Sequence, residues 1–103
     1  MRSGSVKKKR SSGNVFRDLG FPREEAEHLE VRAALMIQIE KAIKARGLKQ
    51  AEAAKIMRVS QPRVSDLLRG RIDLFSTDTL IDMLARLGIG VRLVTRPRSS
   101  RVA

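Results

Sequence analysis

Residues 50–67 read QAEAAKIMRVSQPRVSDL, and this stretch predicts two short helices joined by a tight turn. The first helix is expected over Gln50–Met57, while Ser60 can cap the second, which runs to about Arg69. A small residue, Ala54, stands where the second helix would cross the first, since a larger side chain would push the two apart. The apolar positions expected to fill the space between them recur at helical spacing: Ala53, Ala54, Met57, Val59, Val64, Leu67 and Leu68.

Amphipathic helices are also predicted on both sides of this pair. A long helix runs from Pro22 to Arg46, and another follows Ser76 and ends at Gly88. Their inward positions are expected to be Val31, Leu35, Ile39, Ala42 and Ile43 in the first, and Leu80, Ile81, Leu84 and Leu87 in the second. Gly90–Arg96 then alternates with a period of two, which predicts a strand. The expected fold class is all-α, a bundle of four to five helices with one short C-terminal β-strand.

The 103 residues suffice for one domain, because independent cores typically take about 100–200 residues each. We expect that domain over residues 14–97. Residues 1–13 read MRSGSVKKKRSSG, and this polar, basic, Ser/Gly-rich composition predicts a disordered arm. The arm suits a nucleic-acid contact or a localisation signal, and equally a solubilising tail. Residues 98–103 are expected to form a second basic tail.

The composition argues against catalysis, metal binding and membrane insertion. The chain has no cysteine and one histidine, His28, so thiolate and His-rich metal sites are excluded and a catalytic triad is disfavoured. We therefore expect no enzyme, no cofactor and no metal. Three phenylalanines are the only aromatic residues, which argues against stacking of single-stranded bases. No apolar run approaches the roughly 20 residues of a membrane helix.

The net charge of +11 and the pI near 11.4 point to a polyanionic partner. This charge is unevenly distributed. Residues 41–71 carry nine basic and two acidic side chains, a net +7, while residues 18–40 carry two basic and six acidic ones, a net −4. The basic block coincides with the predicted pair of short helices, which favours a nucleic-acid-binding role for that pair.

The segment QAEAAKIMRVSQPRVSDL resembles the helix-turn-helix of the Xre/Cro/cI family of bacterial and phage repressors, whose domain has the lambda-repressor-like fold. The resemblance implies that Gln50 bonds a DNA phosphate and that Gln61 opens a recognition helix lying in the major groove. Two positions depart from the pattern. Arg58 stands where the family usually has a glycine at positive φ, a conformation that costs a non-glycine residue roughly 1 kcal/mol. Either Arg58 accepts this strain or the turn is built slightly differently. Lys49 stands where serine or threonine would cap better.

The helical wheel of the second helix assigns roles toward double-stranded DNA. Gln61 can bond adenine through two hydrogen bonds and Arg63 can reach guanine, while Asp66 either accepts from cytosine or orients a neighbouring arginine. The full set of expected base contacts is Gln61, Pro62, Arg63, Ser65 and Asp66. The expected phosphate contacts border the groove and comprise Lys49, Gln50, Arg58, Arg69, Arg71 and Ser76.

A lone strand cannot satisfy its own backbone N–H and C=O groups, so the C-terminal strand predicts a two-fold dimer that reads a palindromic operator. The expected interface combines the strand with the last helix, through Leu84, Leu87, Val91 and Leu93.

Over about residues 13–97 the chain also resembles small Xre-type regulators similar to HigA antitoxins, on the words GNVFRDLGFP, RGLKQAEAA and SQPRVSDLLRGR. That likeness implies a bacterial, cytoplasmic repressor that controls its own operon and neutralises a toxin ribonuclease. Two alternatives remain open: a module acting mainly by protein binding, and a non-specific basic nucleic-acid-binding protein.

Overall fold

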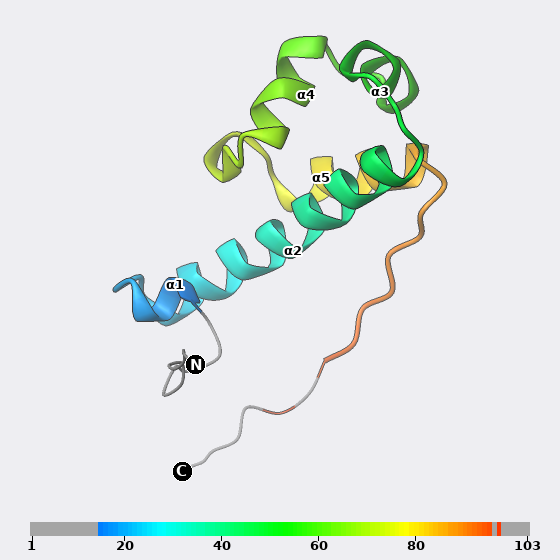
Figure 1. Cartoon of the computed structure of the whole chain (residues 1–103). Coiled ribbons are helices and arrows are strands. Elements are labelled where there is room, and N and C mark those ends of the chain that lie inside the picture. The colour runs from blue at the N-terminus through cyan, green and yellow to red at the C-terminus, as the bar shows by residue number, and fades with distance from the viewer. Residues whose placement is uncertain (1–14, 96, 98–103) are drawn as a thin grey trace, which may run out of the picture.

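The computed structural model describes residues 15–95 and residue 97. In this part of the chain the protein is all-α, as predicted, and a short 3-10 turn joins the last two helices (Figure 1). The predicted disordered arm 1–13 and basic tail 98–103 lie outside the described residues. The elements in chain order are α1 Val15–Asp18, α2 Arg23–Ala45, α3 Gln50–Met57, α4 Gln61–Leu68, η2 Ile72–Leu74 and α5 Thr77–Arg86.

The long helix α2 is the axis on which the other elements are arranged. Figure 1 shows α1 at one end of α2, α3 and α4 toward the other end, and α5 alongside. Pro22 precedes the first helical residue, and Glu24 and Glu25 lie in the first turn, where carboxylates favour the positive end of the helix. Gly47 ends the helix at a φ of 61°, a left-handed conformation that glycine adopts without strain.

The main core lies between α5, the α3–α4 pair and the second half of α2. The predicted core residues Ile39, Ile43, Leu80 and Leu84 are buried there. The helical spacing did not identify several other members of this core, notably Phe75, which is 1% exposed. The complete cluster is Met36, Ile39, Ile43, Ala53, Ala54, Met57, Val64, Leu67, Phe75, Leu80, Met83, Leu84 and Leu87.

Two residues predicted to point inward are exposed instead. Val31 is 48% exposed and does not belong to the main core, whose α2 members begin at Met36. Ile81 is 36% exposed because the buried stripe of α5 passes through its neighbours Leu80 and Met83. Both residues lie in correctly predicted helices. How much of each helix surface is buried depends on where the neighbouring helices pack against it.

A separate small cluster holds α1 against the start of α2. Ala26 and Leu29 are buried there without joining the main core. The rings of Phe16 and Phe21 meet edge to face, with centroids 6.1 Å apart. We call residues 15–31 the acidic arm, because they carry five acidic and two basic side chains. This arm lies at the end of α2 away from α3 (Figure 1).

The predicted C-terminal strand is not formed in the described chain. Residues 90–95 have no regular secondary structure, and Arg96 falls outside the described residues. Figure 1 shows this segment leading away from the helices. The physical reason is the one that predicted a partner: a strand needs a second strand to bond, and a single chain supplies none here. Within the described residues, no helix is long and apolar enough to cross a membrane.

Candidate nucleic-acid interface

The α3–α4 pair has the close packing that the sequence predicts. Ala54 is buried on α3, and Val64 and Leu67 are buried on α4. Arg58 caps α3 with φ 59° and ψ 43°, and it is the one non-glycine residue at positive φ among those described. Of the two possibilities left open by the sequence, Arg58 therefore adopts the left-handed conformation, and the turn is not built differently. This conformation costs a non-glycine residue about 1 kcal/mol, and it places an exposed cation at the turn.

The helix starts differ in how well they are capped. The Ser60 hydroxyl oxygen accepts a hydrogen bond from the backbone N–H of Arg63 at 3.3 Å, as predicted for the cap of α4. At the start of α3 the backbone N–H of Lys49 donates to Glu52 Oε1 at 2.8 Å. The Lys49 ammonium has no acceptor to return, so this half of the usual reciprocal arrangement is missing. The exposed Lys49 charge remains beside the N-terminus of α3.

The six residues predicted to contact phosphate are all exposed. They comprise the start of α3, the turn, the end of α4 and the start of α5: Lys49, Gln50, Arg58, Arg69, Arg71 and Ser76. The hydroxyl of Ser76 caps α5 by accepting from the backbone N–H of Thr79 at 3.1 Å, and it also pairs with the Thr79 hydroxyl at 2.8 Å. Ser76 is thus tied to helix capping, whereas the other five present side chains to solvent.

The five residues predicted to contact bases divide into three groups. Gln61 and Pro62 are exposed at the first turn of α4. Ser65 and Asp66 are half-buried, further along the same helix. The described residues contain no ion pair between Asp66 and an arginine within 4 Å, so the alternative orienting role for Asp66 finds no contact.

Arg63 forms the third group, because its half-buried side chain makes contacts within the protein. Its Nη1 donates to the carbonyl oxygen of Leu74 at 2.9 Å. Its Cζ lies 4.2 Å from the centroid of the Phe75 ring. These contacts bring residues 74–76, at the start of α5, beside the first turn of α4.

Phe75 is the residue of this region that sequence reasoning missed. It lies between η2 and α5, where no helical period marks it as a core position. A different signal was available. Phe75 immediately precedes the cap Ser76, and Leu80 lies at the fourth helical position, which is the spacing of a hydrophobic staple. Both side chains are fully buried in the main core.

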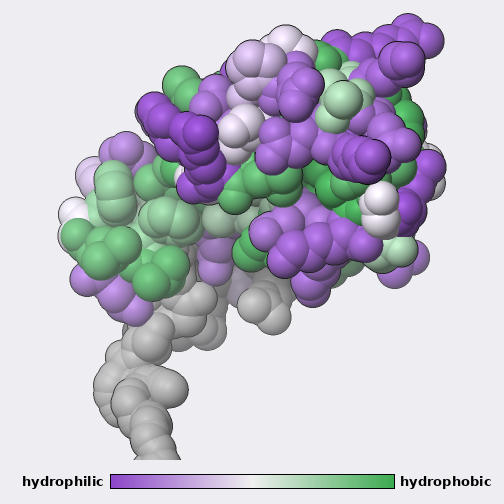
Figure 2. Space-filling view, turned by 45° about the horizontal axis from the view of Figure 1, so that its top comes forward, coloured by the Kyte–Doolittle hydropathy of each residue, from purple (hydrophilic) through white to green (hydrophobic). Residues whose placement is uncertain are grey.

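The electrostatics of this face suit a polyanion. The block 41–71, with its net +7, includes all of α3 and α4, and the view in Figure 2 shows mostly hydrophilic side chains over that half of the molecule. The described residues contain no group of three or more His, Asp or Glu side chains that could hold a metal ion. The exposed cations of this block and the exposed amide of Gln61 at a helix start offer binding chemistry.

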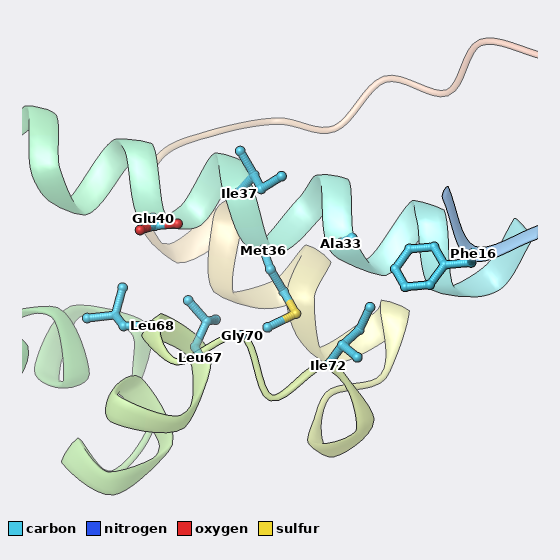
Figure 3. A pocket seen from close by; sticks show the side chains of 9 residues that line it. All are labelled: Phe16, Ala33, Met36, Ile37, Glu40, Leu67, Leu68, Gly70 and Ile72. Atoms are coloured by element: carbon cyan, nitrogen blue, oxygen red, sulfur yellow. The ribbon is translucent and has the colours of Figure 1, made fainter. Parts of the chain in front are cut away.

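A second feature lies between α2 and the end of α4. A groove of about 250 Å³ is lined there by apolar side chains and by one carboxylate, that of Glu40. Figure 3 shows these side chains. Phe16 of α1 lies at one end and Leu68 at the other (Figure 3). The lining residues are Phe16, Ala33, Met36, Ile37, Glu40, Leu67, Leu68, Gly70 and Ile72.

The chain was compared with known families, sequences and structures. The model of a family described as "Helix-turn-helix domain" matches residues 15–96. A solved structure whose description assigns it to the XRE family of transcriptional regulators is similar, with 32% sequence identity and a TM-score of 0.69. The match covers 77% of this chain and 91% of that one. None of the curated proteins matches the chain.

Proposed function

The chain belongs to the helix-turn-helix family and to the XRE class of DNA-binding transcriptional regulators, and from this premise we propose that it is a sequence-specific repressor. In this proposal it binds double-stranded DNA in the bacterial cytoplasm, with α4 in the major groove. The matching family is described as a helix-turn-helix domain, and the similar structure is described as a transcriptional regulator of the XRE family. The finer assignment is carried by the exposed first turn of α4.

Sequence reading requires a side chain that recognises base edges and cations that bind the DNA backbone, and the basic block around the first turn of α4 in the sequence supplies both. Gln61 is exposed at the N-terminal end of the helix, where side chains of a docked recognition helix reach base edges. Its amide can donate to and accept from adenine at once. Exposed Lys49 and Arg58 flank it in the basic block and can anchor the backbone of the same duplex. In this proposal Gln61 provides specificity for the base sequence, and Lys49 and Arg58 position the protein on the duplex.

We expect Gln61→Ala and Lys49→Ala to weaken DNA binding in different ways. Gln61→Ala should lose about 1–3 kcal/mol of discrimination at one base pair, because one bidentate contact disappears. Lys49→Ala should weaken all duplexes alike and reduce the slope of log K against log salt by about one unit, because one phosphate contact disappears. The measurement is a gel-shift series over single-base-pair variants of a duplex selected by the wild-type chain, repeated at several salt concentrations.

Gln38→Ala is the matched control, because Gln38 is also an exposed glutamine but lies on α2. It should change neither discrimination nor salt dependence. If Gln61→Ala keeps the full wild-type preference at every base pair, the assignment of Gln61 as a base reader is wrong. If the wild-type chain selects no preferred sequence, the protein is a non-specific binder.

We further propose that the repressor acts as a two-fold dimer on a palindromic operator. Val91, Leu93 and Val94 are exposed on the segment after α5, and Leu93 is 83% exposed. Pairing of this segment with its copy would satisfy backbone groups along one edge and cover apolar side chains. Leu84 and Leu87 belong to the core of one chain, at 1% and 6% exposure, so the proposed interface uses the segment itself rather than those two residues.

A second candidate function, protein binding as an antitoxin, is favoured by the acidic arm. Within it Val15, Leu19, Phe21 and Val31 are exposed, although they are large apolar residues. Figure 2 shows hydrophobic side chains gathered at the end of the molecule where Figure 1 places α1. The same arm carries five carboxylates, which would repel DNA and attract a basic protein surface. The apolar groove beside Phe16 continues this surface toward α4.

We expect Leu19→Ser to weaken a complex with a basic partner without changing DNA affinity. The measurement is co-purification with the co-expressed product of the neighbouring reading frame, followed by a gel shift of the variant alone. Leu74→Ser is the control, because Leu74 is an exposed leucine on η2, outside the arm. A complex that tolerates Leu19→Ser as well as Leu74→Ser would show that the arm is not the binding surface.

A further inference from the structure

We propose that Arg63 is a positioning residue of α4 rather than a reader of bases. Its guanidinium holds the first turn of α4 against the start of α5, and so sets the orientation in which Gln61 and Pro62 meet DNA. This inference rests on the proposed function, sequence-specific binding through α4. It concerns a different property: how the helix is held, not which atoms read the duplex.

Two contacts of one side chain carry the inference. Arg63 Nη1 donates to the Leu74 carbonyl at 2.9 Å, while its Cζ lies over the Phe75 ring, 4.2 Å from the ring centroid. Phe75 is fully buried in the main core, so the ring is a fixed support. The backbone at Phe75 is also held by α2, where Arg32 Nη1 donates to the Phe75 carbonyl at 3.4 Å.

The geometry of α4 explains why such a support matters. The helix has only eight residues and is buried along one stripe, through Val64 and Leu67. A short helix held along a single stripe can roll about that line of contact. Arg63 lies outside the stripe and adds a second line of contact, directly beside Gln61 and Pro62. A change in this contact therefore alters the aim of both side chains together.

Arginine is the residue that can make both contacts at once. Its planar guanidinium stacks on a ring face while its edge donates a hydrogen bond. A lysine ammonium is a compact point charge without a flat face, so it cannot reproduce the pair of contacts. Arg63→Lys thus removes the support and keeps the positive charge, which separates positioning from attraction to phosphate.

The test measures binding of Arg63→Lys to the duplex that the wild-type chain selects from a random-sequence library, and to all its single-base-pair variants. The measurements are made well below the melting temperature of each variant, so that every sample is folded. We expect the affinity for every specific duplex to fall by the same factor, about three- to thirtyfold, with an unchanged salt slope. A role limited to stability would lower the melting temperature but leave binding by the folded variant unchanged.

Arg46→Lys is the matched control. Arg46 Nη1 donates to the Leu87 carbonyl at 2.9 Å, a bond of the same kind and length that ties α2 to the end of α5 without touching α4. It should lower the melting temperature and leave the affinity of the folded protein unchanged.

Three outcomes overturn the positioning role of Arg63. Loss of preference at one base pair alone would make it a base reader. Wild-type binding by folded Arg63→Lys would make it a stabilising or phosphate-facing residue. Loss of affinity equal to that of Arg46→Lys would show no special role for α4. A selection that yields no preferred duplex would instead overturn the proposed function, and this inference with it.

Discussion

Replacing Phe75 by alanine should lower the free energy of unfolding by about 3–5 kcal/mol, the range for removing a fully buried phenylalanine. The loss has two parts. The side chain is 1% exposed and lies in the main core beside α5, so its removal leaves a cavity. It also removes the ring that supports the Arg63 guanidinium. For a domain of this size such a loss approaches the total stability, which is typically about 5–15 kcal/mol.

Chemical denaturation monitored by circular dichroism measures this effect. Phe21→Ala is the control, because Phe21 is a phenylalanine at 36% exposure that packs edge to face on Phe16, outside the main core. It should cost no more than about 1–1.5 kcal/mol, the worth of one aromatic pair. Equal losses for the two variants would contradict the placement of Phe75 at the centre of the fold.

Ending the chain at Gly90 should convert the proposed dimer to a monomer and lower its affinity for a palindromic operator by about 10²–10⁴-fold. The truncation removes Val91, Leu93 and Val94, the exposed apolar residues of the proposed interface, and keeps Ile89, which packs against the core. The large factor arises because the second half-site is bound by a subunit that is already held nearby. Sedimentation and a gel shift on a palindromic duplex measure the two consequences.

The control ends the chain at Pro97 instead. This version keeps the proposed strand and loses Arg98 and Arg101, so it reveals how much of the effect is due to basic charge in the tail. It should remain a dimer. Its affinity for DNA should fall only by the salt-dependent contribution of the lost basic side chains. Two versions with the same sedimentation behaviour would rule out the C-terminal segment as the interface.

Much of this fold could be predicted from local sequence patterns. The bounds of α3 and the Ser60 cap agree with expectation, because each depends on residues within one or two turns. The second half of α2 and the buried stripe of α5 were found by their helical period. Val31 and Ile81 were not, since their exposure depends on where another helix stops covering the face.

The site was predicted less completely, and Arg63 shows why. A helical wheel places its side chain at the edge of the outward face, about 100° from Val64, and therefore toward solvent or DNA, but it treats α4 in isolation. The partner of Arg63 is the carbonyl of Leu74, eleven residues further along the chain, where the backbone turns into α5. The prediction of a C-terminal strand was wrong for a related reason. A strand forms only beside a backbone partner, and the local sequence pattern of one chain does not show whether that partner is present.

The separation of acidic and basic residues along α2 has a consequence for kinetics. The acidic arm lies at one end of the molecule, and the basic α3–α4 block lies toward the other, so the described domain carries a permanent electric dipole. Near a duplex the field turns the protein until α3 and α4 face the phosphates, before any contact forms. Fewer encounters are then wasted on wrong orientations. This gain in association rate declines as added salt shortens the screening length, which is about 10 Å at 0.1 M ionic strength and shorter at higher ionic strength.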